Sequence, residues 1–94
     1  MTIASNTAAQ ASKADQWTPS YSRWRHGGWY VHGIRYPNGG CGCVSNNYED
    51  GRWRIVCDPR RDQLGGPGDF TFPSRDAAAR AERELVISLG GEAS

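Results

Sequence analysis

The fold is decided by residues 29–58, which read WYVHGIRYPNGGCGCVSNNYEDGRWRIVCD. Two turn signals divide this stretch into three strand-like runs. Asn38-Gly39 is the strongest short hairpin signal, because a type I′ turn needs positive φ at both central positions. Residues 48–52 (YEDGR) are typical of a three-residue loop that ends in a left-handed glycine, Gly51. The sequence therefore predicts two consecutive β-hairpins.

The two turns also predict a register, and the register predicts two faces. A two-residue first loop sets Tyr36 opposite Cys41, and the second loop sets Ser45 opposite Ile55. Opposed residues of antiparallel strands share a face. The expected core face holds Tyr30, His32, Ile34, Tyr36, Cys41, Cys43, Ser45, Trp53, Ile55 and Cys57. A one-residue slip in either turn would scramble this division.

A single helix follows the strands. Residues 59–69 have turn and loop chemistry, and 70–72 form a short extended run. Ser74 is a plausible N-cap, and the Ala-rich stretch from Arg75 to about Leu89 has helical periodicity. Gly90-Gly91 ends it. The expected packing stripe is Ala78, Ala81, Leu85 and Leu89. The order predicts an α+β fold: a three-stranded antiparallel β-meander, with room for a short fourth strand, packed on one C-terminal helix.

Length and composition predict one small domain. Of the 94 residues, we expect 1–16 to be a disordered tail, because they are rich in Ala, Ser and Thr, and 17–91 to form the domain. No apolar run is long enough for a signal peptide or a membrane span. An odd cysteine count of three fits a reducing cytoplasm, so we expect a cytoplasmic protein.

Metal binding and catalysis receive little support from the residues. Cys41, Cys43, Cys57 and His32 could supply four zinc ligands. Their spacing matches no known zinc motif, and buried thiols that act as small hydrophobes are the favoured interpretation. No nucleophile–base arrangement is visible. We therefore expect no catalytic residues, no cofactor and no enzymatic activity.

The expected non-core face carries the chemistry that points to a ligand. Arginine neutralises phosphate and pairs with guanine, asparagine can read adenine, and aromatic rings stack on bases. The segment 21–61 contains seven arginines and three acidic residues, so the sheet is the basic part of the chain. The candidate DNA-binding residues are Arg35, Arg52, Arg54, Trp29, Tyr48 and Asn46.

Two alternatives compete with DNA binding. Exposed aromatic and arginine side chains are also typical of protein interfaces, so the same face could bind a protein partner or form a homodimer. The segment 17–25 could instead fold across this face and bury Trp29, which would leave it a covered structural surface.

A family resemblance supports the DNA interpretation. Residues 28–31 (GWYV), the Asn38-Gly39 turn, 51–55 (GRWRI) and 70–78 (FTFPSRDAA) resemble the AP2-type or arm-type DNA-binding domain of phage integrases. The resemblance covers about residues 28–89. It implies a three-stranded sheet backed by a helix, with the free face in the major groove and Arg35, Arg52 and Arg54 as the readers. It also implies a phage or plasmid origin. For a small protein of that origin, binding and inhibiting a host protein is as natural a role as binding DNA.

Overall fold

The structure is a computed structural model that describes residues 17–94. The predicted disordered tail over 1–16 lies outside the described residues. The elements are, in order, β1 (Tyr21–Trp24), β2 (Gly28–Arg35), β3 (Cys41–Ser45), β4 (Arg54–Ile55), α2 (Arg75–Ser88) and β5 (Glu92–Ala93). Within the described range, no helix combines the length and the apolar character that crossing a membrane requires.

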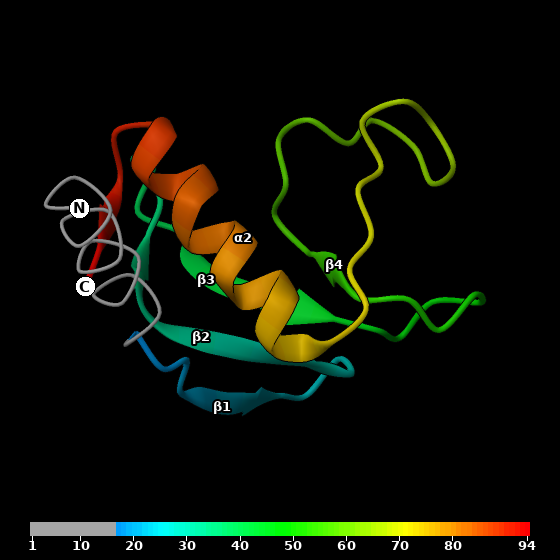
Figure 1. The fold of residues 1–94 in the computed structure, drawn as a ribbon, viewed down its shortest axis with the longest axis horizontal. Coiled ribbons are helices and arrows are strands. Elements are labelled where there is room, and N and C mark those ends of the chain that lie inside the picture. Colours follow the sequence, from blue (N-terminus) through cyan, green and yellow to red (C-terminus); the bar gives the residue numbers. More distant parts are fainter. Residues whose placement is uncertain (1–16) are drawn as a thin grey trace, which may run out of the picture.

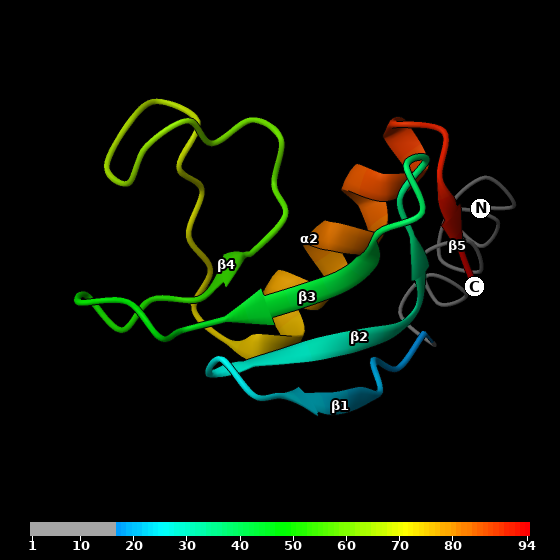
Figure 2. The ribbon, with the colours of Figure 1, turned by 180° about the vertical axis from the view of Figure 1, so that it is seen from behind.

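The strands form one antiparallel sheet in the order β1-β2-β3-β4, and β5 pairs with the far end of β2. The helix α2 lies across one face of this sheet (Figure 1). From behind, β2 and β3 lie in front of α2 (Figure 2). The predicted α+β fold is therefore confirmed, and β1 and β5 are additions that the sequence analysis does not predict.

The first predicted hairpin forms, but its loop is one residue longer than predicted. The Tyr36 N–H donates to the Gly40 carbonyl at 2.8 Å, and the Gly39 N–H donates to the Tyr36 carbonyl at 2.9 Å. Gly39 has a φ of +92°, whereas no residue other than glycine in the described chain has a positive φ. The turn is therefore a three-residue loop closed by a left-handed glycine and not a type I′ turn. As a result Arg35, and not Tyr36, pairs with Cys41.

An irregularity at Gly33 then shifts the register of β2 further. Val31 pairs with Gly42 and Arg35 with Cys41, so three residues of β2 lie opposite no residue of β3. Gly33 has a φ of +79°, a conformation that glycine adopts without steric cost. The alternation of side chains reverses at this bulge. Val31 and Ile34 are consequently both buried.

The second hairpin contains the one-residue slip that would scramble the predicted faces. Gly51 is left-handed as predicted, with a φ of +68°. However, Ser45 pairs with Arg54 and Val44 pairs with Ile55. Because side chains alternate, this slip reverses β3 relative to β4, so that Val44 shares a face with Ile55, and Ser45 shares the other face with Arg54. Ile55 still faces the helix, but it does so beside Val44 and not beside Ser45.

The predicted division into two faces is therefore wrong in part. The helix face, which packs against α2, consists mainly of Tyr21, Trp29, Val31, Ile34, Tyr36, Val44 and Ile55. The open face points away from α2 and is defined by Ser22, Trp24, Tyr30, His32, Arg35, Cys41, Cys43 and Ser45. Cys43 was expected beneath the helix and lies on the open face, whereas Trp29 was expected on the open face and lies beneath the helix.

The segment 17–25 does not cross the open face. Its residues 21–24 form β1, an edge strand beside β2, in which Tyr21 pairs with Val31 and Trp24 with Gly28. The Gly27 N–H donates to the Trp24 carbonyl at 3.1 Å and closes the turn between the two strands. The alternative in which this segment covers the sheet face is therefore wrong, because residues 21–24 widen the sheet instead.

The helix begins and ends where the sequence predicts. The Ala77 N–H donates to Ser74 Oγ at 3.1 Å, and Gly90 follows the last turn with a φ of +83°. The buried stripe differs from the predicted one. Ala78 and Leu85 are buried as expected, but Leu89 is 43% exposed. The buried helix residues are Ala78, Ala79, Glu82, Leu85 and Val86.

Candidate nucleic-acid interface

The six residues predicted to bind DNA do not share one surface. Arg35, Arg52 and Asn46 are exposed and Tyr48 is half-buried. Arg54 is 4% exposed, and Trp29 lies on the helix face. Only Arg35 is exposed on the open face: Arg54 pairs with Ser45 on that face but is buried, and Arg52, Asn46 and Tyr48 lie in the hairpin that joins β3 to β4. A single reading surface made of these six residues is therefore not present.

Arg54 is occupied by two carboxylates. Its guanidinium bonds to both oxygens of Asp50, each at 2.8 Å, and to both oxygens of Asp69, at 2.8 and 3.0 Å. These bonds hold the pKa of each carboxyl below its ordinary value. The Arg54 guanidinium also lies 4.7 Å from the centroid of the Tyr48 ring. Arg54 therefore fixes the 60–69 loop to the 46–53 hairpin. Because two carboxylates already neutralise its charge, it is not available to bind a phosphate.

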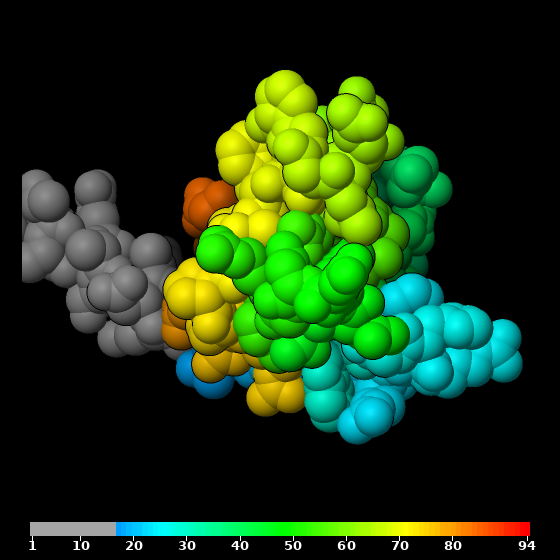
Figure 3. Space-filling model, turned by 90° about the vertical axis from the view of Figure 1, so that its right-hand side faces the viewer, coloured from blue at the N-terminus to red at the C-terminus, as the bar shows by residue number. Residues whose placement is uncertain are grey.

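Figure 3 shows the result of this link: the loop (yellow-green) sits directly against the hairpin (green). In the same view the turn between β1 and β2 (cyan) projects from the body of the protein. This turn contains Arg25 and His26, both of them exposed.

Trp29 is enclosed by two arginines on the helix face. The guanidinium carbons of Arg23 and Arg75 lie 5.0 and 4.8 Å from its ring centroid. Arg75 also lies 4.0 Å from the centroid of Tyr21, whose hydroxyl donates to Asp76. These cation–π contacts join β1 and β2 to the first turn of α2. The arginines and aromatic rings of this side are therefore used to hold the helix.

The open face carries a pair of aromatic rings that the sequence analysis did not select. Trp24 on β1 and Tyr30 on β2 have ring centroids 6.4 Å apart, tilted by 56°. The imidazole of His26 meets Trp24 edge-on at 5.0 Å. Tyr30 is 39% exposed. An aromatic pair on an uncovered sheet face is a suitable surface for stacking or for a hydrophobic partner.

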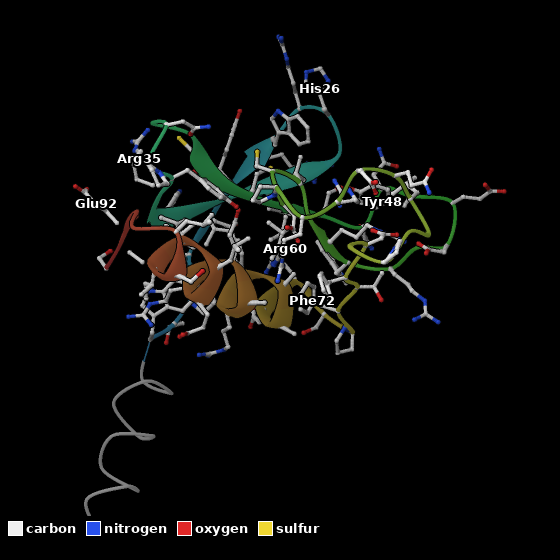
Figure 4. The ribbon with its side chains drawn as sticks, turned by 90° about the horizontal axis from the view of Figure 1, so that it is seen from above. His26, Arg35, Tyr48, Arg60, Phe72 and Glu92 are labelled. Carbon is white, nitrogen blue, oxygen red and sulfur yellow. The ribbon has the colours of Figure 1, made fainter. Side chains whose placement is uncertain are left out.

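Arginine side chains flank the pair at both ends of β2. Arg25 and His26 lie in the turn before β2, and Arg35 is its last residue. Figure 4 shows His26 and Arg35 on the side of the sheet away from α2. Residues 17–48 contain no Asp or Glu. The nearest acidic residue by register is Glu92 of β5, which pairs with Arg35.

His32 is held in place by two hydroxyls of the neighbouring strand segment. Its Nε2 lies 2.6 Å from Ser22 Oγ and its Nδ1 lies 3.1 Å from Ser20 Oγ. Serine and histidine in contact can form a nucleophile–base pair, but here the third group is a second hydroxyl and not a carboxylate. The arrangement orients the imidazole on the open face without activating Ser22.

The four residues considered as zinc ligands are not brought together. His32 bonds to the serines of the β1 edge, and Cys57 lines a hollow with Tyr36, Pro37 and Leu89. Cys43 is buried, and burial raises the pKa of its thiol to about 12, which disfavours the thiolate that a metal needs. In the part of the chain that the structure describes, no three His, Cys, Asp or Glu side chains form a metal-binding group.

The sequence contains a hairpin signal that could have identified Trp24 and Tyr30. Tyr21-Ser22-Arg23-Trp24 is followed by a turn that contains Gly27, and then by the strand residues from Gly28. Aromatic residues that alternate with polar ones before a glycine turn indicate a hairpin. A hairpin at this point would have placed Trp24 and Tyr30 on one face.

Comparisons with protein-family models, with curated proteins and with solved structures find no match to this chain. The resemblance to the AP2-type and integrase arm-type domains therefore remains a prediction.

Proposed function

We propose that this protein is a small non-enzymatic binding module that binds DNA through the open face. The observation that carries the proposal is the chemistry of this face. An exposed ring, Tyr30, and a half-buried ring, Trp24, lie between arginines on strands that have no carboxylate of their own. DNA presents phosphates for the cations and bases or sugars for the rings.

The binding residues of the proposal differ from those expected from sequence. Arg35 is retained, because it is exposed on the open face. Arg25 and the Trp24–Tyr30 pair are added. Arg54 is removed, since Asp50 and Asp69 neutralise it.

The cellular setting is part of the same proposal. Cys41, Cys43 and Cys57 are free thiols, and free thiols persist in a reducing compartment. We place the protein in the cytoplasm on this ground. The phage or plasmid origin follows only from the family resemblance.

The test is binding of a fluorescent DNA oligonucleotide, measured by anisotropy at several salt concentrations. The affinity should fall steeply as salt rises, because phosphate contacts release counterions. The double variant Arg25→Ala/Arg35→Ala should bind at least tenfold more weakly and reduce the slope of log affinity against log salt by about 2. Arg80→Ala, which removes an exposed charge from α2, should change neither value.

Absence of binding at low salt would contradict the proposal, and so would an equal loss in the Arg80→Ala control. The alternative is a protein interface on the same face, and the exposure of Tyr30 beside Trp24 is the observation that favours it. A homodimer would appear in sedimentation experiments as a species that depends on concentration and is lost in Tyr30→Ala.

A further inference from the structure

The open face has the form of a stacking platform, and we propose that it holds nucleic acid as a single strand, with bases stacked on Trp24 and Tyr30. This inference rests on the proposed function and adds the form of the ligand. Stacking on a protein ring needs a base whose face is free, which a duplex does not offer in its grooves. The position of the two rings on the face is therefore the first part of the argument.

Tyr30 lies on the inner strand β2, and Trp24 lies beside it at the end of the edge strand β1. Ser22 pairs with Tyr30, Tyr30 pairs with Cys43, and Trp24 pairs with Gly28. Ser22, Cys43 and Ser45 around them are short, and the neighbouring His32 is held by Ser20 and Ser22, so the rings stand as the largest features of this part of the surface. Reading a duplex in its major groove requires long hydrogen-bonding side chains at the centre of the contact. In the described chain, no Arg, Lys, Asn or Gln side chain lies on the open face between Arg35 and the turn before β2.

Gly28 is the residue that holds the platform in shape. A Cβ placed on Gly28 would lie 2.7 Å from Cε3 of Trp24 and 3.0 Å from the Val44 carbonyl. The Trp24 ring therefore lies against its cross-strand partner Gly28, where a larger residue would leave no room for it. The edge of His26 supports it from the turn. A ring that is already fixed loses little entropy when a base stacks on it.

Arg25 and Arg35, at the two ends of β2, define the line along which a nucleic-acid strand would lie. Arg25 and Arg35 are separated by the whole of β2, whose 8 residues span about 25 Å. A short single strand of a few nucleotides can follow this line, with phosphates at both arginines and bases on the rings between them. Glu92 opposes Arg35 at one end and repels a phosphate there.

The experiment compares a labelled mixed-sequence 20-nucleotide DNA strand with the blunt duplex made from it. We expect the single strand to bind at least tenfold more tightly than the duplex. Tyr30→Leu and Trp24→Leu should each weaken single-strand binding about tenfold or more, whereas Tyr30→Phe, which keeps the ring, should bind like the wild type. Phe70→Leu removes an exposed ring from the loop and should have no effect.

Two further variants test the geometry without removing a contact. Gly28→Ala should displace the Trp24 ring and weaken single-strand binding, although position 28 touches no ligand. Glu92→Gln should tighten binding two- to threefold at low salt. Circular dichroism and thermal unfolding of each variant show whether weaker binding comes from a changed stacking surface or from an unfolded protein. Tyr30→Phe tests whether the ring alone is sufficient for binding, even where another variant unfolds.

The outcomes separate this inference from the proposed function. Equal or tighter binding to the duplex, unaffected by Tyr30→Leu but lost in Arg25→Ala/Arg35→Ala, would overturn the single-strand platform and leave DNA binding in place. No binding to either DNA would overturn both. Binding only to an RNA strand of the same sequence would support the platform and overturn DNA as the ligand.

Discussion

Glu82 shows how one residue can make the stability of the whole protein depend on pH. It is 0% exposed between α2 and the sheet. Its Oε2 accepts from the Tyr36 hydroxyl, and its Oε1 has no hydrogen-bond partner. Burial raises the pKa of this carboxyl from its ordinary 4.5 to about 7. The unfolded chain therefore releases the Glu82 proton at a lower pH than the folded protein does.

The expected consequence is a loss of stability as pH rises. Below about pH 4.5 the carboxyl is protonated in both states, and above about pH 7 it is ionised in both. Between these values only the folded state keeps the proton, so the free energy of unfolding falls by about 3 kcal/mol across the window. Urea denaturation at pH 5 and pH 8 measures this difference.

Glu82→Gln should flatten the profile and should be more stable than the wild type at pH 8, since the amide still accepts from Tyr36 and carries no charge. Glu84→Gln on the same helix is the matched control, because the Glu84 side chain is 72% exposed. An unchanged pH dependence in Glu82→Gln would show that another group is responsible.

At the scale of elements, the close approach of α2 to β3 depends on a glycine. A Cβ on Gly42 would lie 2.9 Å from Ile34 Cβ and 3.0 Å from Glu82 Oε1. Both neighbours are buried and cannot move away freely. Small residues on the facing helix, Ala78 and Ala79, complete the contact.

Gly42→Ala should therefore destabilise the protein by about 2 kcal/mol through overpacking. Gly40→Ala is the control, because its nearest neighbour is the exposed side chain of Asn38 at 3.1 Å and the core residue Tyr36 lies at an ordinary contact distance of 3.9 Å. The midpoints of thermal unfolding of both variants measure the effect. Equal midpoints would mean that α2 shifts to accept the methyl group.

At the scale of the whole molecule, Arg54 joins segments that are far apart in the sequence. The side chains of Arg54 and Asp69 are 5% and 2% exposed, so removal of the arginine leaves a buried carboxylate. Asp69 also accepts the Gly65 N–H at 2.8 Å. The link therefore orders the loop internally as well as against the hairpin.

Arg54→Met should lower the free energy of unfolding by about 2 kcal/mol or more, because one partner of a buried pair is missing. It should also speed hydrogen exchange at the Gly65 amide while the amides of β2 and β3 stay protected. Arg52→Met, an exposed neighbour, should do neither. Uniform loss of protection would indicate that the network stabilises the whole fold and not the loop.

The existence of most elements could be predicted from local chemistry. Gly39, Gly51, Ser74 and Gly90 act within a few residues of their own position, so turn and cap signals locate the hairpins and the helix. The candidate site could be predicted only in part. The sequence predicts Arg35 but not Trp24, Tyr30 or Arg25, because their common face exists only once β1 pairs with β2.

The sequence by itself determined the α+β class, the order of strands and helix, and the places where the chain turns. Only the tertiary structure decided which side chains lie under α2 and which lie on the open face. The physical reason is that alternation along a strand amplifies small errors: one extra residue in a loop, or a left-handed Gly33, reverses every side chain beyond it. It also decided that Arg54 is neutralised, because Asp69 reaches it only after the loop has folded back.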